Sequence, residues 1–156
     1  MRGFLLFVHI LGFTAWLGGG LSMMITGIRA KGWPPAERLV AYRVCGIVAR
    51  TFVGPGAALV LGTGFGLIGP FMSNPETMTG RLNAMMGFGI LGALIALGVM
   101  LPTASRLGGL RLTPTGELPA EFPVLRKRLA IWATAAGVLG LAALVSATML
   151  AAAVLA

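Results

Sequence analysis

Long apolar runs separated by short polar segments make up most of this chain. The first extends from Phe4 to Ile28 without a charged residue, and three more lie at about 44–70, 82–101 and 129–153. A helix needs about 20 mostly apolar residues to cross the hydrocarbon core of a bilayer. Strands of a transmembrane barrel would instead show alternating segments of about ten residues. The pattern therefore predicts four membrane-spanning helices.

Prolines between and within these runs predict where the helices begin, bend and end. Pro35 is expected to open the second helix in the interface, before the helix enters the membrane. Pro55 lies inside the second span and predicts a kink. Asn74-Pro75 predicts a turn. Pro102 is expected to end the third helix, and residues 103–128 are expected to form an ordered or semi-ordered loop.

The composition agrees with a membrane protein. Hydrophobic residues make up 57% of the 156 residues and charged residues only 10%, whereas soluble domains carry about 25% charged residues. The lone Cys45 excludes a disulfide scaffold and is expected to be a free thiol. We therefore expect one all-α transmembrane domain over residues 1–156, a polytopic four-helix bundle.

The distribution of charge predicts the orientation of this bundle. The formal net charge is +8, which by itself would suggest nucleic acid as a partner. Most basic residues, however, fall in or beside the connections 29–43 and 102–128, and such an excess marks cytoplasmic loops. We expect both termini on the non-cytoplasmic side of a bacterial inner membrane, the bilayer itself as a partner, and no nucleic acid. The ten residues concerned are Arg29, Lys31, Arg38, Arg43, Arg50, Arg106, Arg111, Arg126, Lys127 and Arg128.

Arg50 is the basic residue that lies deepest in a predicted span. A charged side chain within the membrane costs roughly 3 kcal/mol on insertion scales. Arg50 is therefore either a buried functional group or a side chain that extends to the cytoplasmic headgroups. Its position, about six residues from the expected boundary, favours the second interpretation.

Small residues recur every four positions in the second span, at Gly54, Ala58, Gly62 and Gly66. Helices in membranes associate by close approach at such residues, because lipid tails are as apolar as leucine. We expect this row to be a helix-packing face. Similar pairs in the third and fourth spans suggest surface left over for a partner subunit or for self-association.

Few side chains could carry chemistry. The chain has no Asp, and its four glutamates lie in the predicted loops or at the start of the second helix, so catalysis by side chains alone is not expected. His9, the only histidine, shares a helical face with Trp16 and Met23. At a matched depth, Met85, Met86 and Met149 complete a soft ligand set for Cu(I), or an axial set for haem b. The alternative, which we favour, is that His9 bonds a backbone carbonyl, the methionines fill gaps, and no cofactor is bound.

The stretch from His9 to Gly19, in which the histidine is followed seven residues later by Trp16 and then by glycines, resembles the first-helix pattern of the copper-resistance D superfamily of bacterial membrane proteins. The segment from Arg50 to Gly64, and Leu101-Pro102, are similar to a related family of predicted integral-membrane proteins. The resemblance implies a four-helix bundle with His9 near its outer face. Relatives are linked to copper uptake, and a neighbouring group of haem-binding membrane proteins to porphyrin oxidation.

A single histidine excludes haem ligation by two histidines of one chain, and leaves His/Met ligation, a haem shared between protomers, or no cofactor. The function we expect first is that of a non-catalytic accessory or structural subunit that packs against partner membrane proteins, as in a respiratory or photosynthetic complex. The alternatives are copper handling or transport by His9 with the methionines, and haem b binding with His9 as axial ligand.

Overall fold

Four long helices form the molecule, and the computed structural model describes residues 1–72 and 80–155 of the chain. The first helix is α1 (Arg2–Arg29), followed by a 3₁₀ turn (Ala30–Gly32). The second consists of α2 (Pro35–Val48), a π-helical turn (Ala49–Val53) and α3 (Gly54–Met72). The third consists of α4 (Gly80–Ile95), a π-helical turn (Ala96–Met100) and α5 (Leu101–Gly108). The fourth is α6 (Phe122–Leu155).

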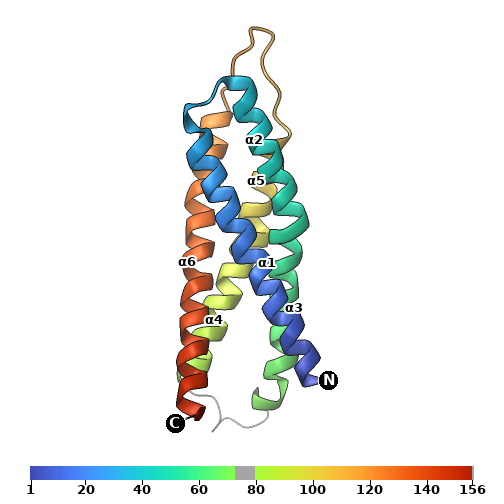
Figure 1. Ribbon diagram of the computed structural model, residues 1–156, viewed down its shortest axis with the longest axis vertical. Coiled ribbons are helices and arrows are strands. Elements are labelled where there is room, and N and C mark those ends of the chain that lie inside the picture. The colour runs from blue at the N-terminus through green and yellow to red at the C-terminus, as the bar shows by residue number, and fades with distance from the viewer. Residues whose placement is uncertain (73–79, 156) are drawn as a thin grey trace.

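The helices run alternately in opposite directions along the long axis of the molecule (Figure 1). Both termini lie at one end, and the segments 30–34 and 109–121 lie at the other. Within the described residues, all four long helices are long and apolar enough to cross a membrane. The prediction of a helical chain with four long apolar helices is therefore confirmed.

The ends of the third and fourth helices differ from our expectation. Pro102 does not end the third helix, which continues to Gly108, and α6 begins at Phe122 rather than near residue 129. The prediction of a loop over 103–128 is therefore wrong at both ends of that stretch, and only 109–121 lacks long helices. The predicted turn at Asn74-Pro75 lies outside the described residues.

The two π-helical turns explain how prolines fit inside long helices. One turn ends at Val53, two residues before Pro55, and the other ends at Met100, two residues before Pro102. A proline has no N–H, and its ring collides with the carbonyl group four residues earlier. A wider turn directly before each ring relieves that collision, so the helix passes through the proline.

Glycines allow two close helix crossings. A Cβ atom built on Gly56 of α3 would lie 2.6 Å from the Gly12 carbonyl oxygen and 2.7 Å from the Trp16 nitrogen of α1. Near the other end, a Cβ on Gly46 of α2 would lie 3.0 Å from the Ala104 carbonyl oxygen of α5. At the first crossing the backbones approach as only glycine permits, and at the second a Cβ would require the neighbouring backbone to shift by a few tenths of an ångström.

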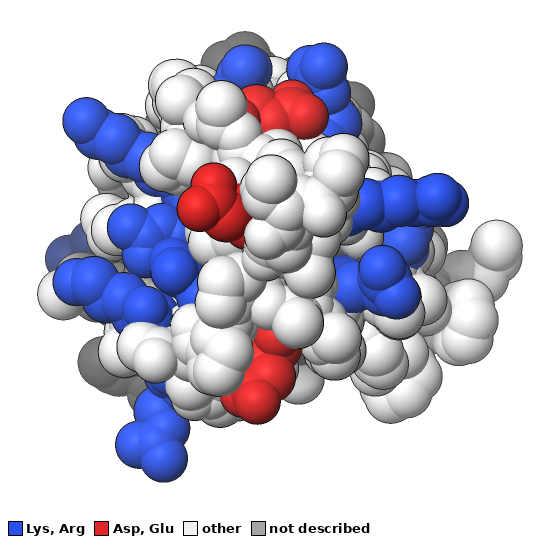
Figure 2. Space-filling view, turned by 90° about the horizontal axis from the view of Figure 1, so that it is seen from above, with Lys and Arg blue, Asp and Glu red and all other residues white. Residues whose placement is uncertain are grey.

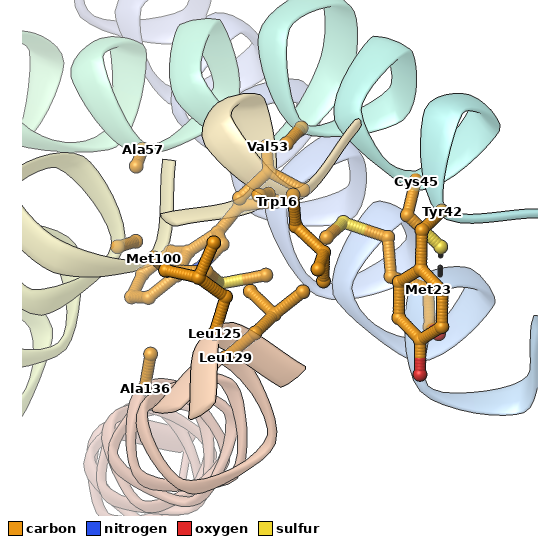
Figure 3. Packing of buried hydrophobic residues seen from close by; sticks show 14 of the residues in the cluster. Trp16, Met23, Tyr42, Cys45, Val53, Ala57, Met100, Leu125, Leu129 and Ala136 are labelled. Atoms are coloured by element: carbon orange, nitrogen blue, oxygen red, sulfur yellow. Dashed lines mark hydrogen bonds between the residues drawn. The ribbon is translucent and has the colours of Figure 1, made fainter. Parts of the chain in front are cut away.

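The core is centred on Trp16, whose side chain is 2% exposed. Its ring reaches from α1 across to α4 and α6, where Gly92 leaves space for it and Gly140 leaves space for the adjacent Leu17. Figure 3 shows Met100 beside it, and a second group in which Met23 of α1 lies near Cys45. The shared buried face of Trp16 and Met23 confirms the helical face predicted for them.

Candidate functional site: a cavity beside His9

A cavity of about 570 Å³ lies between four helices, in the half of the bundle that contains the termini. Its walls come from α1, α3, α4 and α6, and it is partly open. The lining residues are Leu6, His9, Ile10, Phe13, Thr14, Leu17, Val60, Leu61, Gly64, Phe65, Leu67, Ile68, Met85, Met86, Gly89, Ile90, Ala143, Leu144, Ala147 and Thr148.

His9 is the most polar side chain in this wall, and α3 holds it in place. Its Nδ1 atom lies 2.9 Å from Thr63 Oγ1, and the Thr63 hydroxyl donates to the Leu59 carbonyl oxygen at 2.5 Å. The hydroxyl has a single proton, which the carbonyl accepts, so Nδ1–H must donate to Thr63. This hydrogen-bond pattern assigns the proton to Nδ1 and the lone pair to Nε2.

Gly64 lies against the imidazole ring, where a Cβ would make ordinary van der Waals contact. A Cβ there would stand 3.4 Å from His9 Cε1 and 3.8 Å from Nδ1. Sequence reasoning did not single out Gly64 or Thr63. The available signal was a hydroxyl residue inside an apolar span at the same depth as His9, and this signal does not say whether the hydroxyl faces α1.

Three of the four predicted metal ligands reach this cavity. His9, Met85 and Met86 line it and are half-buried. The Met149 side chain is 57% exposed and does not line it. The Met149 carbonyl oxygen instead accepts a hydrogen bond from Arg81 Nη1 at 3.4 Å. The structure therefore separates Met149 from the other three.

The two threonines of the cavity wall use their protons within their own helices. Thr14 Oγ1 donates to the Ile10 carbonyl oxygen, and Thr148 Oγ1 donates to the Val145 carbonyl oxygen, both at 2.9 Å. Each hydroxyl therefore offers only a lone pair to the cavity. The polar side chains of the wall present acceptors and no free donor.

The donor set suits one of the two cofactors that the sequence suggested. An imidazole nitrogen with two thioether sulfurs is a soft ligand set of the kind that Cu(I) prefers. Haem b fits less well, because its two carboxylates need cationic partners and no Lys or Arg is among the described residues that line the cavity. Elsewhere in the described part, no cluster of three His, Cys, Asp or Glu could hold a metal ion.

The basic end of the molecule lies opposite the termini. Figure 2 shows Lys and Arg side chains around its rim, with the acidic side chains between them. The guanidinium of Arg38 lies 5.2 Å from the centroid of the Phe122 ring. Arg50 is exposed on the outside of the second helix, and this position agrees with a side chain that extends along the surface.

The small-residue row of the second span is used only in part within this chain. Gly54 is buried, where a Cβ would meet Leu101 Cδ2 at 3.1 Å, but Ala58, Gly62 and Gly66 are exposed. No described atom lies within 4 Å of a Cβ built on Gly62. The close packing of α3 on α1 uses the neighbouring position Gly56 instead. That a partner covers the exposed part of the row stays a prediction.

Comparisons with other proteins leave the family open. No family model matches the chain, and no curated protein or solved structure is detectably similar to it. The resemblance of the His9–Gly19 stretch to copper-resistance proteins therefore stays a prediction, and the function has to be argued from the site.

Proposed function

We propose that the protein is a non-catalytic accessory subunit of a bacterial inner membrane, which packs against other membrane proteins. The basic end faces the cytoplasm and both termini face the other side, since positively charged loops stay on the cytoplasmic side. Four long apolar helices and the Lys and Arg residues gathered at one end support this arrangement.

The observation that carries the subunit role is the exposed small-residue row of α3. Ala58, Gly62 and Gly66 leave a shallow strip along which another helix could approach closely. In lipid the hydrophobic effect does not drive helices together, because lipid tails are as apolar as the helix surface. Close packing at small residues is therefore one of the main contributions to helix association. A partner helix, from another subunit or a second copy, would cover the strip.

Substitution of Gly62 by leucine tests this role with a matched control. Gly62→Leu blocks close approach to α3 without a clash inside the chain, because the space around Gly62 is open. Gly87→Leu in α4 is the control, since Gly87 is also exposed with open space around it. The partners that co-purify with the wild-type chain in mild detergent should be lost from Gly62→Leu and retained by Gly87→Leu. A chain that always runs as an isolated monomer would refute the proposal.

Copper handling is the second candidate function. The observation that favours it is the presence of His9, Met85 and Met86 in one cavity wall. Metal analysis of the purified wild type and of His9→Ala tests it: copper should fall in the variant, and equal copper content in both would reject the site. A visible spectrum of the same samples tests haem through its Soret band.

A further inference from the structure

We propose that the cavity beside His9 binds a neutral, lipid-soluble molecule that carries a hydroxyl group, with an alkylphenol as the simplest example. The volume of about 570 Å³ lies within the range of about 300–1,000 Å³ found for small-molecule pockets. A single metal ion would leave most of this space empty. The inference goes beyond the subunit role and does not depend on it.

The lining restricts the ligand to a neutral and mostly apolar body. All four helices contribute aliphatic, aromatic or thioether side chains, and none of the described lining residues is Lys, Arg or Glu. An ionised ligand would lose its hydration there without meeting an opposite charge. The cavity is partly open, and its lining residues Leu6, Ile10 and Leu144 are exposed on the outside of α1 and α6, so a ligand dissolved in the membrane could enter between these helices.

The polar atoms of the wall restrict the ligand further. The hydroxyl protons of Thr14 and Thr148 are both directed to carbonyl groups of their own helix, and the Nδ1 proton of His9 is directed to Thr63. What these groups offer to the cavity is lone pairs. A ligand that only accepts hydrogen bonds, such as an ether or a ketone, would find no donor among them, whereas a hydroxyl would find an acceptor.

His9 is the acceptor best placed to receive this hydrogen bond. Two consecutive hydrogen bonds, from Nδ1–H to Thr63 and from Thr63 to the Leu59 carbonyl, tie the ring to α3. No described group donates to Nε2. Because the ring is oriented before a ligand arrives, little side-chain entropy is lost when Nε2 accepts a hydroxyl proton.

The test is a cycle of two ligands and two proteins in lipid nanodiscs. The ligands are 4-nonylphenol and its methyl ether, which differ in the O–H donor, and the proteins are the wild type and His9→Leu. Binding is followed by quenching of Trp16 with ring-brominated versions of both ligands, after Trp33→Phe and Trp132→Phe remove the two exposed indoles. Trp16 does not line the cavity itself, but its ring packs on that of the lining residue Phe13 with a centroid distance of 5.7 Å. Trp16 is therefore close enough to report a ligand in the cavity.

We expect the phenol to bind the wild type about three- to tenfold more tightly than the ether, the range that one neutral hydrogen bond provides. His9→Leu should remove this preference and leave the affinity for the ether unchanged. Thr63→Val should reduce the preference while His9 stays present, which covers the case in which His9→Leu fails to fold. Ala147→Phe should block both ligands, and Leu141→Phe, on the exposed side of the same helix, should block neither.

Two results would overturn the proposal. Equal affinity of the wild type for the phenol and the ether would show that Nε2 accepts no hydrogen bond from the ligand. Saturable binding of Cu(I) that depends on His9, together with an absence of phenol quenching, would identify the cavity as a metal site.

Discussion

Alanine at two glycines of the same helix should change the stability of the protein in opposite directions. At Gly56 the new Cβ would lie 2.6 Å and 2.7 Å from backbone atoms of α1, about 0.8 Å inside ordinary van der Waals contact. Neither atom is the end of a flexible side chain, so α1 and α3 must separate along their crossing. Overpacking of this kind costs about 1–3 kcal/mol, and we expect the upper end because the contact is with backbone.

The expected net effect follows from two opposing contributions. Replacing a helical glycine by alanine contributes about 1 kcal/mol in favour of the helix. Gly56→Ala should therefore lower the free energy of unfolding by about 2 kcal/mol, while Gly62→Ala, with open space around it, should raise it by up to about 1 kcal/mol.

The assay is unfolding of the purified protein by SDS in mixed micelles, followed by helical circular dichroism. Gly12→Ala supplies an independent check, since its Cβ would lie 2.9 Å from the Gly56 carbonyl oxygen. The double variant should cost less than the sum of the single ones, because either substitution alone already separates the helices. If Gly56→Ala unfolds at the same SDS fraction as Gly62→Ala, or at a higher one, the crossing at Gly12 does not exist as described.

Three further predictions follow from burial and from the proposed orientation. Cys45, 2% exposed with its Sγ 3.9 Å from the Met23 carbonyl oxygen, should react with maleimide only after unfolding in SDS, and rapid labelling of the folded protein would contradict its burial. In a Cys45→Ala background, Thr115→Cys in the exposed connection before α6 should react with an impermeant maleimide in inside-out vesicles and not in intact cells, and the reverse would invert the orientation. Met100→Ala, at a side chain 1% exposed, should lower the free energy of unfolding by about 2–5 kcal/mol in the SDS assay, whereas Met149→Ala, at a side chain 57% exposed, should change it by less than about 0.5 kcal/mol.

The helices were predictable from the sequence because each is an unbroken apolar run of sufficient length. Their ends were less so. Pro102 normally signals a helix end, and it failed here because a π-helical turn at Ala96–Met100 accommodates the ring. The same device precedes Pro55. Hydrophobic periodicity does not distinguish a π-helical turn from an α-helical one. The continuation of the third helix to Gly108 could therefore not be predicted from the hydrophobic pattern.

The packing face of the second helix shows a different limit. Rows of small residues at a spacing of four overlap in a chain with 24 glycines, so the row that packs cannot be chosen by spacing alone. The row that packs is determined by where the backbone of the neighbouring helix lies. Gly56 is used because the backbone of α1 between Gly12 and Trp16 lies against it, while no described atom approaches Gly62.

The candidate site could be predicted in part for a similar reason. The depth of a residue in the membrane follows from its number of residues from the end of the span. Such counting placed His9, Met85 and Met86 at the same depth. Rotation about each helix axis is set by packing, and it directs Met149 to the outside of α6. Thr63 was missed because its role depends on the crossing of α1 and α3, which places its hydroxyl beside the His9 ring.

Trp16 accounts for the place of the cavity in the bundle. Its ring spans from α1 to Gly92 and Gly140 and fills the centre of the molecule. Toward the termini, α1 packs mainly on α3 and α4 mainly on α6, and the cavity beside His9 lies between these two pairs. A ligand seated there would touch all four helices and would bind the folded protein only. It should therefore raise the SDS fraction needed for unfolding, and the rise should disappear with Ala147→Phe, whose ring would occupy the same space.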